Sequence, residues 1–183
     1  TDVDTSSGEP SRNVMALLKG SDPELRKEVV VLGAHYDHLG VAPDGLVFNG
    51  ADDNASGTSV VLALAEAMAA SPRRPRRSVM FVLFSGEERG LLGSAWQVAH
   101  PTAVPLANMV AMVNLDMVGR YRPEEFSVGG VGTAAEWKPI LDRLLPAHGL
   151  AVRYGQSGNA PTDNTSYNRK RIPVLFFFTG FHP

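Results

Sequence analysis

Four apolar stretches of the sequence each lead directly into residues that can bind a metal ion. They read VVVLGA (residues 29–34), VMFVLFSG (79–86), VAMVNL (110–115) and VLFFFTGF (174–181). Uninterrupted runs of Val, Leu and Phe of this length are typical of strands that are buried on both faces of a parallel sheet. Open α/β sheets bind their ligands at the carboxyl ends of such strands. The sequence therefore predicts that the residues following these strands meet at one site.

The residues that follow the apolar runs supply imidazole and carboxylate groups. They are His35, Glu87 with Glu88, Asp116 and His182. A further acidic pair, Asp52 and Asp53, precedes a helical segment and can join the same edge of the sheet. Imidazole and carboxylate ligands without thiolates suit zinc, and less often manganese or cobalt, in a catalytic role.

Helical and extended patterns alternate along the chain. Apolar residues recur at helical spacing in residues 58–70, and helices are also expected at residues 91–100 and 136–148. Strands are expected at residues 29–34, 79–84, 110–115 and 172–178, with an edge strand at 13–18, and residues 39–50 form a loop over the site. This order predicts an α/β fold in which a mixed, largely parallel β-sheet is sandwiched by α-helices in three αβα layers. The whole of residues 1–183 is expected to be one domain.

Composition excludes some partners and ligand types. Seventeen Lys and Arg residues against nineteen Asp and Glu residues give a formal net charge of −2. We therefore expect neither nucleic acid nor an anionic membrane surface as a partner. No apolar run approaches the roughly 20 residues of a membrane span. The sequence has no cysteine, which rules out disulfides and Cys-ligated zinc.

The segment around His35 indicates how its ring is oriented. Residues two apart on a strand lie on the same face, so Asp37 is placed to hydrogen-bond the ring nitrogen of His35 that faces away from a metal. Such a bond would fix the tautomer of the imidazole. A solvated histidine at a strand end is the alternative. We expect His38 to be a loop residue rather than a ligand.

Each acidic pair has a functional and a structural interpretation. Asp52 and Asp53 either cap the following helix or place one carboxylate between two metal ions. Glu87 and Glu88 point in different directions at a strand end, so one can bind metal while the other transfers a proton; a solvated acidic turn is the alternative. Asp116 follows a buried strand directly and needs a partner to offset its desolvation.

Together these motifs resemble the M28 family of zinc peptidases, the co-catalytic two-zinc aminopeptidases. The resemblance lies in AHYDHLG (34–40), NGADDNASG (49–57), FSGEERGLLGS (84–94), NLDMVGR (114–120) and the segment 162–183. It implies that His35 and Asp116 hold one zinc ion, that Glu88 helps to hold a second, and that Asp52 bridges the two.

The same resemblance assigns the remaining roles. It implies that Glu87 is the general base and that Asp37 supports a ligand from outside the metal's own shell. It also implies a cis peptide bond between Asp52 and Asp53.

The C-terminal segment departs from the family pattern. In relatives the histidine of the second zinc lies a few residues beyond a similar TG-x-H, and the sequence ends at Pro183. The resemblance therefore implies that the C-terminal segment of the catalytic domain is lacking and that the second site is incomplete, whereas the strand-end argument assigns His182 to it. The Ser-Asp-His usual in the family reads Thr162-Asp163-Asn164 here.

The resemblance implies a metal-dependent exopeptidase that removes the N-terminal residue from a peptide by means of a zinc-activated water. The expected substrate is a peptide with a free N-terminus, and the expected location is secreted or periplasmic. Two other functions remain open on the same scaffold. One is glutaminyl-cyclase-like chemistry with a single zinc, and the other is a binding domain without catalysis.

Overall fold

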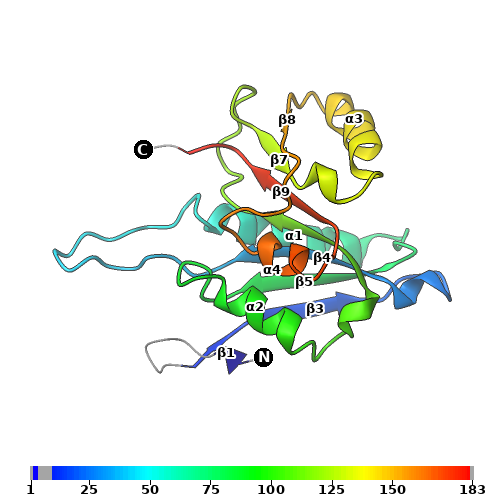
Figure 1. Cartoon of the computed structure of the whole chain (residues 1–183), viewed down its shortest axis with the longest axis horizontal. Helices are drawn as coiled ribbons and strands as arrows, with labels where there is room; N and C mark the ends of the chain where they lie inside the picture. The colour runs from blue at the N-terminus through cyan, green and yellow to red at the C-terminus, as the bar shows by residue number, and fades with distance from the viewer. Residues whose placement is uncertain (1, 4–9, 182–183) are drawn as a thin grey trace.

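A seven-stranded sheet forms the centre of the computed structural model, which describes residues 2–3 and 10–181 (Figure 1). Its strand order is β3-β5-β4-β6-β9-β7-β8. The four parallel strands are β5 (Ser78–Phe84), β4 (Val29–His35), β6 (Met109–Leu115) and β9 (Val174–Phe178). Strands β3 (Val14–Leu18) and β7 (Ser127–Gly129) flank them in antiparallel pairing, and β8 (Arg153–Tyr154) runs parallel to β7. A small separate sheet pairs β1 (Asp2–Val3) with β2 (Ser11–Arg12). The expected mixed, largely parallel sheet is confirmed.

Helices cover both faces of this sheet. They are α1 (Ala55–Ala70), α2 (Leu92–Ala99), α3 (Trp137–Ala147) and α4 (Asn164–Asn168). Three single turns of 3₁₀ helix are η1 (Leu25–Lys27), η2 (Leu106–Asn108) and η3 (Val131–Thr133). Helix α1 begins three residues before the expected start because Asn54 caps it, with its side-chain oxygen accepting the N–H of Gly57. In the part of the chain that the structure describes, no helix combines the length and apolarity needed to cross a membrane.

The core has two layers because side chains alternate between the faces of each strand. Buried Val31 and Met80 lie on the face covered by α2 and α4, where they share a cluster with Tyr167 of α4. Phe81 lies on the opposite face and shares a cluster with Val61 of α1. Helix α3 adds to that opposite layer through buried residues that share a cluster with β9.

The register of the parallel strands brings the site residues to one edge. His35, the last residue of β4, is paired with Phe84, the last residue of β5. On the other side of β4, Gly33 is paired with Asn114, which lies two residues before Asp116. The loops that follow β4, β5 and β6 therefore start side by side.

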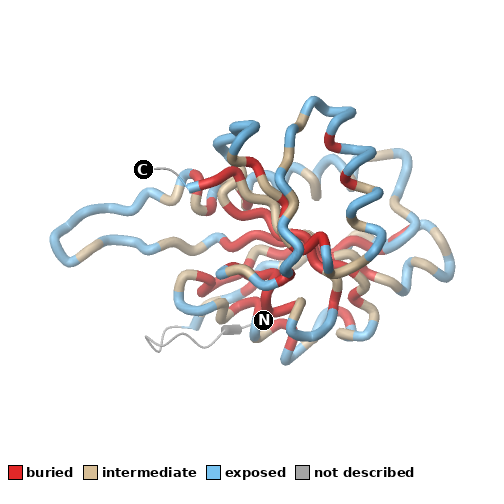
Figure 2. Tube along the Cα trace, turned by 45° about the horizontal axis from the view of Figure 1, so that its top comes forward, coloured by how far each residue is buried: buried red, intermediate tan, exposed pale blue. Residues whose placement is uncertain are grey.

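The segment between β4 and α1 does not fold over the site as expected. Residues 39–50 instead form a hairpin that extends away from the body of the molecule, and most of it is exposed (Figure 2). Val41 and Val47 pair across it, and the main-chain N–H of Phe48 donates to the carbonyl of Gly40. These bonds within the hairpin let it stand out from the sheet. Both of its ends remain at the edge where the strands end.

Candidate metal centre

A pocket of about 350 Å³ opens at the carboxyl edge of the parallel strands. Its charged lining is His35, Asp53, Glu87, Glu88 and Asp116. Its other lining residues are Met117, Pro161, Thr162, Phe176, Phe178 and Phe181. Four of the residues expected at the site therefore meet here, together with Asp53 in the place expected for Asp52. The expected ligand His182 lies outside the described residues.

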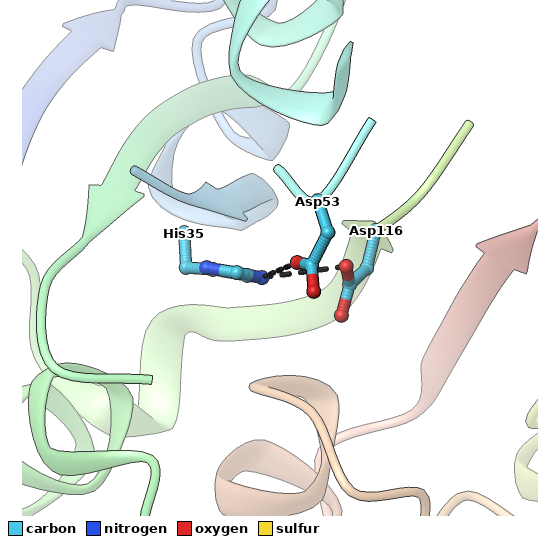
Figure 3. A group of neighbouring side chains, drawn as sticks. All are labelled: His35, Asp53 and Asp116. Atoms are coloured by element: carbon cyan, nitrogen blue, oxygen red, sulfur yellow. Dashed lines mark hydrogen bonds and ion pairs between the residues drawn. The ribbon is translucent and has the colours of Figure 1, made fainter. Parts of the chain in front are cut away.

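Three side chains from three different segments face one another in this pocket (Figure 3). Nε2 of His35 lies 3.2 Å from Oδ1 of Asp53 and 3.3 Å from Oδ1 of Asp116. Zinc–ligand bonds of about 2.0 Å in a tetrahedral arrangement place neighbouring ligand atoms about 3.3 Å apart. Both the kinds of donor and their spacing therefore fit a zinc ion.

The ring of His35 is fixed by its second nitrogen. Its Nδ1 donates a hydrogen bond to the main-chain carbonyl of Asp37 at 3.1 Å, which leaves Nε2 facing the carboxylates. Burial lowers the pKa of His35, but the hydrogen bonds to Asp116 and Asp53 outweigh burial and raise the pKa to about 11. Without a metal the ring is thus protonated. Nε2 would have to lose that proton to serve as a metal ligand.

The carboxylate of Asp37 has a different task from the expected one. It lies 3.8 Å from Nδ1 of His35, too far for a hydrogen bond. Its two oxygens instead accept the main-chain N–H groups of Glu87 at 3.1 Å and of Glu88 at 3.3 Å. Asp37 therefore orients His35 through its carbonyl and holds the turn that carries both glutamates through its side chain.

The two neighbouring aspartates are assigned differently by the structure and by the resemblance. Asp52 does not face His35; its Oδ1 accepts the N–H of Gly119 at 2.7 Å. The cis peptide bond joins Asp53 to Asn54, one residue beyond the expected place. The geometry thus puts Asp53 in the position between the metal-binding groups. No periodicity in an irregular loop distinguishes two adjacent aspartates, so the sequence left this choice open.

Glu87 is a buried carboxylate beside the three facing side chains. It is 8% exposed, and its Oε2 lies 3.9 Å from Nε2 of His35. Burial raises the pKa of Glu87 to about 8; the charge of His35 opposes this rise, and the charges of Asp163 and Asp116 add to it. A carboxylate with a raised pKa at this position is suited to accept and return a proton near neutral pH.

His38 belongs to the site, although it was expected to be a loop residue. Its Nδ1 lies 2.8 Å from Oε1 of Glu88 and 3.8 Å from Oδ2 of Asp53. The three side chains form one of the groups in which donor atoms lie close enough to share a metal ion. The motif AHYDHLG contained this histidine, but a residue three positions beyond a strand end has no fixed direction.

A buried acid lies behind the pocket. Asp163 precedes α4, is completely buried, and both of its carboxylate oxygens lack a hydrogen-bond partner within residues 10–181. Burial raises the pKa of Asp163 to about 7. Its neighbour Thr162 lines the pocket and accepts a hydrogen bond from the side chain of Asn114 at 2.8 Å.

Comparison with known proteins identifies the family. The model described as "Peptidase family M28" matches residues 13–183. The aminopeptidase YwaD of Bacillus subtilis is 34% identical over 113 residues, which cover 62% of this chain and 23% of that protein. The solved structure of BSAP, a zinc aminopeptidase from Bacillus subtilis, superposes with a TM-score of 0.77 and 26% identity over 97% of this chain and 43% of that one.

A third comparison bears on the fold alone. The glutaminyl cyclase of Porphyromonas gingivalis superposes with a TM-score of 0.76 at 22% identity, over 98% of this chain and 67% of that one. The chain spans less than half the length of both Bacillus proteins. The family match and the geometry of the strand ends lead to the same conclusion: this chain belongs to peptidase family M28.

Proposed function

We propose that this chain is a zinc-dependent aminopeptidase domain that hydrolyses the first peptide bond of substrates with a free N-terminus. The observation that carries the proposal is the facing arrangement of His35, Asp53 and Asp116, with the buried carboxylate of Glu87 beside it. We further propose that the centre would hold two zinc ions and that Asp53, which belongs to two groups of possible ligands, would help to hold both. Zinc supplies Lewis-acid activation of a water and of the scissile carbonyl when it is bound.

The residues of this chain have distinct tasks in that reaction. Glu87 accepts a proton from the attacking water at a carboxylate oxygen and passes it to the nitrogen of the leaving amine. Asp37 keeps Glu87 in place through the main-chain hydrogen bond. The acidic lining of the pocket attracts the positively charged amino group of the substrate.

The apolar part of the pocket determines which first residue fits. Phe176, Phe178 and Met117 line it, and among residues 10–181 no Lys or Arg belongs to its lining. We therefore propose that the domain prefers a large apolar N-terminal residue. A buried acidic side chain would find no basic partner there and would lose binding free energy on desolvation.

The experiment measures hydrolysis of leucine anilide, glutamate anilide and N-acetylated leucine anilide by the zinc-loaded chain. We expect kcat/KM to be at least ~10-fold higher for leucine than for glutamate, and no turnover of the acetylated compound. Glu87→Gln should lower kcat by about 10²–10⁴-fold and leave the zinc content unchanged, because it removes a proton acceptor rather than a ligand. Turnover of the acetylated compound would contradict the aminopeptidase assignment.

A peptide beginning with glutamine separates this function from cyclase chemistry. Hydrolysis releases free glutamine and adds one water to the products. Cyclisation releases ammonia and leaves the peptide bond intact. Mass spectrometry of the products distinguishes the two reactions, and a zinc-loaded chain that catalyses neither would be a binding domain.

A further inference from the structure

His38 stands at the root of the exposed hairpin and faces the metal centre. Its side chain is 21% exposed, and Nδ1 points to Glu88 and Asp53. The carboxylate of Asp53 lies between two imidazoles: Oδ1 is 3.2 Å from Nε2 of His35, and Oδ2 is 3.8 Å from Nδ1 of His38. The two oxygens of one carboxylate therefore face two separate groups of donors.

The ring of His38 is held in this direction by its surroundings. Phe48 packs against it edge to face, with ring centroids 6.4 Å apart at an angle of 77°. Gly50 lies under the side chain: a Cβ at this position would come within 3.1 Å of Cβ and 3.0 Å of Cγ of His38. Gly50 has a φ of +66°, which favours glycine as well. These contacts hold the imidazole with Nδ1 toward the two carboxylates.

The spacing of the donors matches that of a metal position. Neighbouring ligand atoms of a tetrahedral zinc ion lie about 3.3 Å apart. The two distances from Nδ1 of His38, 2.8 Å to Glu88 and 3.8 Å to Asp53, lie on either side of that value. Shifts of about 0.5 Å in each side chain bring both distances to it, and the glutamate side chain rotates freely enough to allow this.

We infer that His38 supplies the imidazole of the second metal position in this chain, together with Glu88 and the second oxygen of Asp53. The inference rests on the proposed two-zinc function and adds a ligand to it. One imidazole with two carboxylates gives three protein ligands, the number that catalytic zinc sites use while a fourth position stays open.

Titration of zinc into the metal-stripped chain tests the inference. We expect two ions per chain for the wild type. His38→Ala should weaken the second ion by at least about 100-fold, more than the ~10–100-fold that loss of an outer hydrogen-bond partner costs. The first ion, at His35, should be held as before. His148→Ala, at an exposed histidine after α3, is the matched control and should retain both ions.

The outcomes separate the inference from the proposed function. A wild-type chain that binds no zinc contradicts both. A second ion that is weakened less than about 100-fold by His38→Ala overturns the role of His38 alone. A single ion in the wild type and in the variant alike overturns both the role of His38 and the proposed second zinc ion, but not the proposed hydrolysis at the first site. His182→Ala tests the competing ligand. If His182→Ala loses the second ion and His38→Ala keeps it, the inference is overturned as well.

A second variant gives a signal that a folding defect cannot imitate. His38→Cys introduces the single thiol of the chain and keeps a zinc-type ligand at the position. When this variant is loaded with two equivalents of Co²⁺, we expect a thiolate-to-cobalt charge-transfer band that the wild type lacks. The band should appear with the second equivalent. Its absence in a variant that binds both cobalt ions would show that residue 38 is not a ligand.

Discussion

Asp52 and Asp53 are neighbours whose carboxylates serve different parts of the molecule. Asp53 faces His35 with one oxygen and His38 with the other. The Oδ1 of Asp52 accepts the N–H of Gly119, three residues beyond Asp116. Asp52 thus connects the loop before α1 to the loop after β6.

Substitution of Asp53 should therefore affect zinc binding, whereas substitution of Asp52 should affect the stability of the fold. Asp53→Ala should abolish tight binding of both zinc ions and leave the fold intact. Asp52→Ala should keep two ions but lower the free energy of unfolding by about 0.5–1.5 kcal/mol, because the main-chain N–H of the exposed Gly119 loses its acceptor and can bond water instead. Zinc content after dialysis and urea unfolding of the metal-free chain measure the two effects. Loss of both ions from Asp52→Ala, with Asp53→Ala unaffected, would restore the assignment implied by the resemblance.

The elements differ in how far the sequence predicts them. Strands β4, β5 and β6 are apolar over most of their length, because both faces are covered by helices, and this pattern identifies them as strands. Strands β7 and β8 contain only three and two residues, which is too short for an alternation of apolar and polar residues to be recognised in the sequence. Helix α4 (Asn164–Asn168) is mostly polar and yet buried, so no amphipathic pattern indicates it.

The same distinction applies to the candidate site. Residues that end or directly follow long strands were placed together by the sequence because strand ends share one edge. Asp53 and His38 lie in irregular backbone, where direction depends on tertiary contacts such as the packing of Gly50 against His38. At these two positions the arrangement differs from the expectation: the cis peptide bond follows Asp53, and His38 lies beside Asp53 and Glu88.

The start of α1 is pressed against the end of β6. Asn54 joins them: its side-chain oxygen accepts the N–H of Gly57, and its side-chain nitrogen donates to the carbonyl of Leu115 at 3.0 Å. A Cβ on Gly57 would lie 2.3 Å from that same carbonyl oxygen. Only glycine allows the helix to approach the strand this closely. The loop that carries Asp53 depends on this contact.

Gly57→Ala should therefore destabilise the protein although alanine is the better helix former. The clash is with main-chain atoms, so α1 must move away from β6, at a cost of about 1–3 kcal/mol. The gain of roughly 1 kcal/mol in helix propensity is not expected to offset it. Urea unfolding measures the difference. Ser59→Ala, at an exposed position of the same helix, is the control and should be neutral or slightly stabilising. Equal stability of Gly57→Ala and the wild type would contradict the close approach.

At the scale of the whole molecule, the small net charge of −2 conceals an uneven distribution. Carboxylates gather at the carboxyl edge of the sheet and raise one another's pKa, as Asp163 does for Glu87. Folding without metal therefore brings like charges together in a buried region, which is unfavourable. A bound cation offsets this repulsion and stabilises the folded state by mass action. Removal of metal should consequently lower the midpoint of thermal unfolding.

The buried acid Asp163 makes the stability of the metal-free chain depend on pH. Burial raises its pKa from about 4 in the unfolded chain to about 7. Between these values the folded state binds more protons than the unfolded state, so the contribution of Asp163 to the free energy of unfolding falls as pH rises and levels off above pH 7. Asp163→Asn removes this contribution and should make the slope between pH 4.5 and 7 shallower, and the slope that remains is the one due to Glu87. Asp44→Asn, at the exposed hairpin, is the control and should follow the wild type. Urea unfolding in the presence of a chelator at several pH values measures the slope of the free energy of unfolding against pH. An unchanged slope in Asp163→Asn would show that the carboxyl group of Asp163 does not keep its proton in the folded state.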